Sequence, residues 1–350
     1  MSYHATDRSA VTTDRRLARR TVLATGAAIL GVGAPSASIA ASDGPEQTNK
    51  ASSAGSCDSE LDRWDRPVVR TDADWDTTVS DARYCSLPCA LTESTPLRIG
   101  QQIRLSGGGP NGYETAAFTV ADHRDDGAVG LTDGGLSRMD LADGDGVTIG
   151  ARPVHPSYAS RNAARLNEEY AEYLVGDVAA TSVLAMAPHG GHIELGTDFQ
   201  AERVAETTGG LGWVAAGFYD GAGTYNRWHV PSIDVEIDSF PALSGLAGGT
   251  YDWTVAFHGL ADDAIIVGGT ASEVDRQTVA DAITARLPNT PVELGSDSTT
   301  GYDGSSPINV LNRIGQTGRT LQLEQPKSVR VNDWHAVADG VADAIGELSA

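Results

Sequence analysis

The sequence predicts an α/β domain with a mixed sheet and flanking helices over residues 155–350, preceded by a small all-β, barrel-like domain over residues 66–154. Two observations lead to this prediction. Between 66 and 154, short segments alternate apolar and polar residues at period two and are separated by glycine-rich turns. From 155 onward, helical stretches alternate with apolar strands, which is typical of α/β domains.

The first region contains four segments with the alternation of half-buried strands, so a small barrel or sandwich is expected there. Glycines at 107–109 and at Gly144 and Gly146 mark turns between them. We find no catalytic set of residues in this region and expect a binding or spacing module. The predicted strands cover 97–106, 115–124, 128–133 and 145–154.

The second region alternates helices with strands whose carboxyl ends are the places to look for functional residues, because active sites of such sheets gather there. Apolar spacing near 3.6 predicts helices, and short continuous apolar runs predict buried strands. The predicted helices cover 160–175, 272–287 and 332–348, and the predicted strands cover 181–188, 251–259, 262–270 and 317–326.

The N-terminus has the features of an export signal. Arginines including Arg19 and Arg20 precede an apolar run at 21–32 that is too short to span a membrane, and small residues follow. The arginine pair is similar to the twin-arginine motif. We therefore expect a signal peptide at 1–40, a polar linker at 41–65, and a secreted protein that leaves the membrane after cleavage.

The chain is strongly acidic, with a formal net charge of -22 and only two lysines, Lys50 and Lys327. This charge argues against nucleic acid and anionic lipid as partners, because both need a basic surface. An excess of acids with few lysines indicates a halophilic protein. Three cysteines, Cys57, Cys85 and Cys89, allow at most one disulfide and one free thiol.

Candidate chemistry lies at the ends of three predicted strands. His189 and Glu194 follow the first, His258 ends the second, and Glu324 lies near the end of the third. Two histidines and one carboxylate are a common ligand set of a catalytic zinc ion. A further carboxylate outside the metal shell is what such a site needs as a general base.

These residues carry a resemblance to a known family. The stretch SVLAMAPHGGHIELGTDFQAERVAE at 182–206 resembles the signature of the zinc-dependent poly-γ-glutamate hydrolases, which include phage depolymerases. The segments FHG, IIVGGT and NVLNRIGQTGRTLQLEQPKSVR continue the similarity in the same order over about 156–350. The resemblance implies a zinc-carboxypeptidase-like fold and one Zn²⁺ per chain.

The resemblance also implies roles for single residues. His189, Glu194 and His258 match the zinc ligands, and Glu324 matches the catalytic carboxylate that takes a proton from water and passes it to the leaving amine. His192 departs from the family pattern, in which a glycine is usual. It could ligate in place of His189, line the substrate channel, or point away.

Substrate contacts are expected from His192, from His229 in a segment that departs from the family, and from an arginine that stabilises the oxyanion or a substrate carboxylate. The candidate arginines are Arg203, Arg319 and Arg330. The expected function is hydrolysis of poly-γ-glutamate or a related γ-glutamyl polymer by a monomer. Alternatives are a carboxypeptidase-like peptidase or cell-wall amidase acting on peptides, and a non-catalytic secreted binding protein of the same fold.

Overall fold

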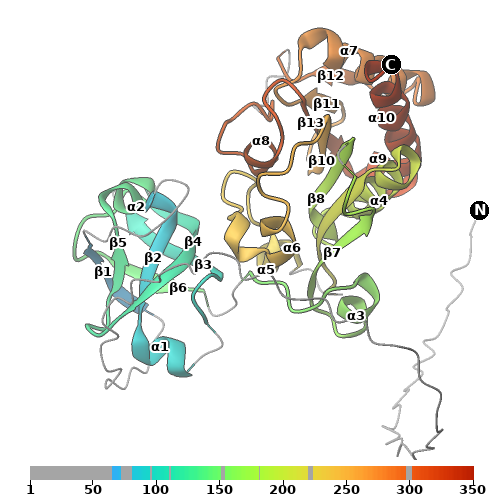
Figure 1. Ribbon diagram of the computed structural model, residues 1–350. Coiled ribbons are helices and arrows are strands. Elements are labelled where there is room, and N and C mark those ends of the chain that lie inside the picture. The colour runs from blue at the N-terminus through green and yellow to red at the C-terminus, as the bar shows by residue number, and fades with distance from the viewer. Residues whose placement is uncertain are drawn as a thin grey trace, which may run out of the picture. The chain divides into compact units, whose positions relative to one another are not determined.

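A mixed seven-stranded sheet is the centre of the second half of the chain in the computed structural model (Figure 1). The structure describes residues 65–71, 81–94, 97–109, 112–150, 154–180, 182–219, 224–296 and 302–350. Residues 53–350 form one compact unit, and the predicted domain boundaries stay predictions. The predicted signal peptide, all but the last residue of the predicted linker, and Cys57 lie outside the described residues.

The strands of this sheet follow the order β12-β11-β13-β10-β8-β9-β7. The four strands β13, β10, β8 and β9 are parallel neighbours, so their carboxyl ends meet at one edge. β11 and β7 pair antiparallel with this block, which confirms the predicted mixed sheet. The strands are β7 (Tyr170–Gly176), β8 (Val183–Gly191), β9 (Leu211–Gly217), β10 (Trp253–Leu260), β11 (Ile265–Gly268), β12 (Val292–Leu294) and β13 (Thr320–Pro326).

Alternate residues of the strands feed two different cores, because side chains of a strand point to opposite faces in turn. Val255 and Leu323 pack in the core that contains α4, α7 and α10, whereas Ala256 packs with α6 and α8 on the other face. The helix α10 contacts both α4 and α7 (Figure 1). The helices are α3 (Arg161–Leu166), α4 (Thr197–Thr208), α5 (Thr224–Trp228), α6 (Pro241–Ser244), α7 (Glu273–Arg286), α8 (Val310–Ile314), α9 (Lys327–Asn332) and α10 (Trp334–Leu348), with a 3-10 turn at Ile237–Ser239.

The first region forms a closed barrel in the strand order β1-β5-β2-β4-β3-β6. Its interior is filled by apolar side chains such as Leu87, Ile103 and Phe118, each fully buried. Short helical segments accompany the strands. The elements are β1 (Asp65–Arg70), a 3-10 turn (Asp81–Arg83), β2 (Tyr84–Pro88), α1 (Cys89–Ser94), β3 (Gln102–Gly109), β4 (Gly112–Arg124), β5 (Val129–Leu131), α2 (Asp133–Arg138) and β6 (Gly146–Ile149).

The helix predicted over 160–175 is wrong in its second half. The helix α3 ends at Leu166, and Glu168 adopts a positive φ of 54°, which turns the chain out of the helix. The next residues form β7, which pairs antiparallel with β9 along its whole length. Pairing with β9, a strand that the sequence pattern did not predict, outweighs the local helical spacing of this segment.

Two further sequence features have a defined place. Cys85 is a free, buried thiol, and Cys89 is disulfide-bonded. No helix in the described parts of the chain combines the length and the apolar character that a membrane span requires.

The difference in burial between leucines predicts that the same Leu→Ala substitution changes the stability of the fold by unequal amounts at different positions. Leu321 in β13 is fully buried, whereas Leu166 at the end of α3 is 86% exposed. We expect Leu321→Ala to destabilise the fold by about 2–5 kcal/mol, because it leaves a cavity in the helix-covered core. Leu166→Ala should change stability by less than about 0.5 kcal/mol. Chemical denaturation at high salt measures both, and equal shifts of the midpoint would contradict this account of the core.

Candidate metal centre

A β-bulge in β8 brings His189 to the face of the sheet that carries the site. Between Ala187 and Gly190, β8 advances three residues while the facing part of β9 advances two. The extra residue reverses the alternation, so that Gly190 faces α4 and His189 faces the opposite side. A Cβ on Gly190 would lie 2.9 Å from the Cβ of Asp198 in α4, which explains why this position has no side chain.

The strand register brings His258 and Glu324 to the same edge. β10 and β13 are parallel, and His258 of β10 lies opposite Glu324 of β13. Both residues belong to the alternate set that faces away from α4, α7 and α10, as Ala256 does. Two strands far apart in the chain therefore place an imidazole and a carboxylate side by side.

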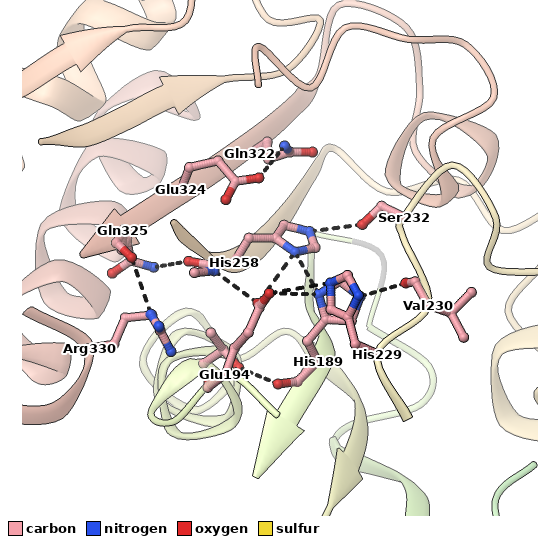
Figure 2. A network of polar contacts seen from close by, with 12 residues as sticks. His189, Glu194, His229, Val230, Ser232, His258, Gln322, Glu324, Gln325 and Arg330 are labelled. Atoms are coloured by element: carbon pink, nitrogen blue, oxygen red, sulfur yellow. Dashed lines mark hydrogen bonds and ion pairs between the residues drawn. The ribbon is translucent and has the colours of Figure 1, made fainter. Parts of the chain in front are cut away.

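Three buried side chains converge at this edge, as Figure 2 shows: His189, Glu194 and His258. The Nδ1 atoms of the two histidines are 3.2 Å apart. Oε1 of Glu194 lies 3.2 Å from Nδ1 of His189, and Oε2 lies 3.7 Å from Nδ1 of His258. The loop after β8 makes this possible, because the N–H of Glu194 donates to the carbonyl of His189 and closes a tight turn.

A hydrogen bond to the backbone determines which ring nitrogen of His189 carries the hydrogen and which one presents a lone pair to the cluster. Its Nε2 lies 2.7 Å from the carbonyl oxygen of Val230. A carbonyl oxygen can only accept, so Nε2 carries the hydrogen and Nδ1 of the neutral ring presents a lone pair. The Nε2 of His258 has a partner as well, the hydroxyl of Ser232 at 3.3 Å. Such partners orient a histidine ring for metal binding.

The carboxylate of Glu194 is also fixed. The backbone N–H of Gly259 donates to its Oε2 at 2.9 Å. Burial would raise the pKa of Glu194, but the adjacent His189 and His258 outweigh burial and hold that pKa well below its usual value. Conversely, burial would lower the pKa of His189, and the Glu194 carboxylate raises it instead. Both pKa shifts have one cause: the negative charge of the Glu194 carboxylate is stabilised by positive charge on the neighbouring imidazole.

The spacing of the three ligand atoms fits a single metal ion. Four ligands at about 2.0–2.1 Å from a tetrahedral zinc ion lie about 3.3 Å from one another. The two Nδ1 atoms are 3.2 Å apart, and the two oxygens of Glu194 lie 3.2 Å and 3.7 Å from the nearer Nδ1 atom. With one ligand atom from each residue, all three atoms lie within 4.8 Å of one another. Two imidazole nitrogens and one carboxylate oxygen, all buried, can therefore hold one metal ion and leave a fourth position for substrate or water.

His229 lies against this cluster without belonging to it. Its ring centroid is 4.2 Å from that of His189, and its Nε2 is 3.7 Å from Oε1 of Glu194. The ring of Tyr225 stacks on that of His229, with centroids 4.1 Å apart. Burial, together with the neighbouring His189, lowers the pKa of His229 to about 3. His229 is therefore neutral at neutral pH and can donate a single hydrogen bond into the site.

Glu324 stands beside the cluster and outside the ligand set. It is 7% exposed, and its Oε1 accepts a hydrogen bond from Nε2 of Gln322 at 2.9 Å. Burial, with the nearby Glu194 carboxylate, raises its pKa well above the usual value, and the Gln322 hydrogen bond opposes this rise. A carboxyl group with a raised pKa beside a metal site is suited to exchange protons near neutral pH.

Arg330 is the predicted arginine that lies at this site. Its Nε donates to the carbonyl of Gln325 at 3.2 Å, and its Nη1 donates to the carbonyl of Leu195 at 2.9 Å. The guanidinium group lies where a Cβ of Gly259 would be, at 2.5 Å, so Gly259 leaves room for it. This buried cation interacts with the charges of Glu194 and Glu324.

The segment that carries His229, Val230 and Ser232 is tied to residues of the barrel strand β3. Arg104 donates to the carbonyls of Arg227 at 2.8 Å and His229 at 2.5 Å. Gln102 donates to the carbonyl of Asp234 and accepts from the N–H of Glu236. The loop that holds both histidine ligands in place is thus itself held through its backbone.

Two of the predicted arginines do not reach the cluster. Arg203 on α4 forms an ion pair with Asp339 of α10, on the helical side of the sheet. Arg319 stacks on Trp253 one residue before β13, about 16 Å along the strand from Glu324 at about 3.3 Å per residue. The structure thus places neither side chain at the cluster, and their contacts with substrate stay predictions.

His192 also lies outside the ligand set. Its Nδ1 is 3.1 Å from the carbonyl of Tyr219, and its ring packs edge-on against Phe218 after β9. Val230, Ser232 and Gln322 were not predicted from the sequence. Gln322 could have been found, since it lies two residues before Glu324 and so on the same face of the strand, whereas a carbonyl such as that of Val230 leaves no signal in a sequence.

A sequence profile of the family described as poly-gamma-glutamate hydrolase matches residues 160–336. This is half of the chain and includes His189, Glu194, His229, His258 and Glu324. The chain belongs to the poly-gamma-glutamate hydrolase family. It is therefore a hydrolase of amide bonds, and the buried His–Glu–His cluster is the candidate metal centre of this hydrolase.

Solved structures similar to this hydrolase include a bacteriophage poly-gamma-glutamate hydrolase, at 24% identity and a TM-score of 0.45, over 54% of this chain and 93% of that chain. The zinc-free apo form of YNDL matches at 20% identity and a TM-score of 0.43, over 52% and 92%. Murine aminoacylase 3 matches at 12% identity and a TM-score of 0.28, over 49% and 67%. A search of curated protein sequences found no match.

The raised pKa of Glu324 predicts a pH-dependent effect on the stability of the metal-free hydrolase. Below the unfolded pKa, about 4.3, Glu324 is protonated in both states, and Glu324→Gln should change little. As pH rises toward the folded pKa, the unfolded chain loses this proton first, which destabilises the wild type and not the variant. In chelator, the melting temperature of Glu324→Gln should therefore exceed that of the wild type by a margin that grows as the pH rises above about 4.3 toward the folded pKa. A difference that is constant with pH would contradict the assignment.

The contacts of Arg104 predict that barrel residues support the site. Arg104→Met leaves the carbonyls of Arg227 and His229 without their donor, which should cost about 1–3 kcal/mol of stability. Because His229 then loses its fixed place, hydrolysis should fall several-fold while the bound metal is retained. Arg98→Met, at an exposed arginine that precedes β3, is the control. Equal activity of the two variants would show that these contacts do not matter for catalysis.

Proposed function

We propose that this hydrolase is a secreted, zinc-dependent enzyme that depolymerises poly-γ-glutamate or a related γ-glutamyl polymer. The observation that carries the proposal is the cluster of His189, Glu194 and His258 with Glu324 beside it, in a chain of this family. Zinc is the proposed metal because two imidazole nitrogens and one carboxylate in tetrahedral spacing suit it.

Each residue of the cluster has a separate task. His189, Glu194 and His258 would hold the ion, with Val230, Ser232 and Gly259 orienting them through hydrogen bonds. When bound, zinc polarises the scissile carbonyl and makes water more acidic.

Glu324 is the proposed general base and acid. It is buried, and because its pKa is raised it can take a proton from water and give it to the nitrogen of the leaving amine. The C–O bond to the water oxygen forms first, and the amide C–N bond breaks when its nitrogen has received the proton, so one water molecule is consumed for each amide cleaved. Glu324 regains its original state once the amine leaves.

His229 and Arg330 would stabilise the charge that develops on the carbonyl oxygen. The neutral imidazole of His229 offers one N–H donor within the site. Arg330 contributes a fixed positive charge, since two of its donors are bound to backbone carbonyls and its position cannot vary. Because these groups already have their positions before the reaction, they can stabilise the developing charge without the free-energy cost of rearranging the site.

The acidic polymer and the acidic enzyme would repel each other in dilute buffer. At about 1 M salt the screening length is only about 3 Å, so repulsion between surface charges largely disappears. A protein with a net charge of -22 should therefore cut a polyanion faster in brine. This charge supports a halophilic enzyme, and the export-signal features of residues 1–40 support secretion.

The decisive experiment compares γ-linked and α-linked polyglutamate at high salt, with zinc or with chelator. We expect the γ-linked polymer to lose molecular mass only when metal is present. Glu324→Gln should bind one zinc ion per chain and hydrolyse at least about a hundredfold more slowly, because it removes the proton acceptor. His258→Ala should lose both zinc and activity.

The outcomes separate the alternatives. Cleavage of the α-linked polymer in preference would indicate a peptidase and reject the proposed substrate. A wild-type protein that binds no stoichiometric metal would reject the metal centre. Undiminished turnover of Glu324→Gln would remove Glu324 from the reaction.

A further inference from the structure

Glu324 is one end of a chain of buried side-chain amides. Gln322 Nε2 donates to Glu324 Oε1 at 2.9 Å, and Asn309 Nδ2 donates to Gln322 Oε1 at 2.8 Å. The three residues are 4–7% exposed, so bulk water does not compete for these hydrogen bonds. This amide chain, Asn309–Gln322–Glu324, connects the start of α8 to the candidate general base (Figure 2 shows its last two members).

The direction of the amide chain is determined by a backbone group. Asn309 is the N-cap of α8, and its Oδ1 accepts from the N–H of Leu311 at 3.0 Å. A backbone N–H can only donate, so this atom of Asn309 is the oxygen and the other is the NH₂ group. Gln322 must then turn its oxygen to Asn309 and its own NH₂ group to Glu324.

A fixed donor makes the two oxygens of Glu324 unequal. Oε1 accepts an N–H, and a carbonyl oxygen accepts a hydrogen bond better than the hydroxyl oxygen of a protonated carboxyl group, so this donor favours a proton on Oε2 over one on Oε1. Oε2 receives no donor from the amide chain. We propose that Asn309 and Gln322 are positioning residues that hold Oε1 as an acceptor and leave Oε2 to carry the proton; the proposal rests on the proposed function of Glu324.

The helix α8 gives this arrangement its rigidity. The N–H of Val310, at the first position of the same helix, donates to the carbonyl of Ser232 at 2.9 Å. Ser232 is the residue whose hydroxyl contacts His258. The start of one short helix thus positions both the general base and the partner of a metal ligand.

Two substitutions at Asn309 distinguish positioning from simple structural support. Both Asp and Ser are good N-caps, so both keep α8. Asn309→Asp has nearly the shape of asparagine but offers only acceptors, so Gln322 must turn round and point its oxygen at Glu324. Asn309→Ser is too short to reach Gln322 and leaves that side chain free to keep its donor toward Glu324.

We expect Asn309→Asp to lower kcat at least about tenfold, with KM and zinc content unchanged, and to move the acidic limb of the pH profile to higher pH, because an oxygen facing Oε1 favours its protonated form. Asn309→Ser should lower kcat only about two- to threefold. A purely structural role predicts the reverse order, since aspartate is the closer match in shape. That order would overturn the proposal.

The added charge of Asn309→Asp is controlled with Gln322→Met. If the amide chain transmits the effect, the double variant should be no slower than Gln322→Met alone, because the group that turns is gone. Additive losses would instead indicate a direct effect of charge and contradict the proposal.

An NMR measurement that does not depend on catalysis tests this proposal separately from the proposed function. The side-chain NH₂ signal of Gln322 in NMR, assigned by its loss in Gln322→Met, should be protected from exchange in the zinc-bound wild type. It should move in Asn309→Asp and stay close to its place in Asn309→Ser. If the wild type cuts no γ-linked polymer but the Gln322 signal shows the expected protection and shifts, only the substrate assignment fails. An unchanged signal in Asn309→Asp would overturn the amide chain.

Discussion

Electron-rich atoms face one another at the centre of this hydrolase, and the surrounding structure holds them there. The Nδ1 atoms of His189 and His258 and the carboxylate of Glu194 lie within 3.2–3.7 Å of one another in a buried place. Such a cluster is unfavourable without a positive charge among its members. The Val230 carbonyl and the Gly259 N–H prevent the groups from turning away. Folding therefore places these groups in advance for a cation to bind.

The parts that hold the cluster come from distant regions of the chain. The sheet provides His189, His258 and Glu324, and the loop after α5 provides His229 and the partners of both histidine ligands. That loop is bound in turn by Arg104 from β3 and by the start of α8. Residues with no reactive group therefore decide the precision of the site, in the way that outer hydrogen bonds tune metal centres in general.

The sequence predicted the mixed sheet and the reactive residues because both leave local signals. His189, Glu194, His258 and Glu324 stand at strand ends, where apolar runs meet polar residues, and the structure brings them together. Helical spacing at 160–175 misled the prediction, since pairing with β9 depends on contacts remote in sequence. Arg203 and Arg319 carry the right chemistry but lie elsewhere, because position in three dimensions is not encoded by residue type.

The supporting contacts were out of reach for a related reason. A backbone carbonyl such as that of Val230 exists at every position, so only the fold shows which one is used. The direction of the amide chain through Gln322 likewise depends on Asn309, a neighbour thirteen residues earlier that becomes adjacent only when α8 packs on β13.

Because of the bulge in β8, the position of His189 depends on the number of residues in this strand. His189 faces the cluster only because one extra residue stands between Ala187 and Gly190. The identity of that extra residue matters less than its presence, since the reversal of the strand's two faces follows from number alone. Two related chains could thus share every reactive side chain and still differ in chemistry, if one were a single residue shorter in this strand. Segment length is in this sense part of the metal centre.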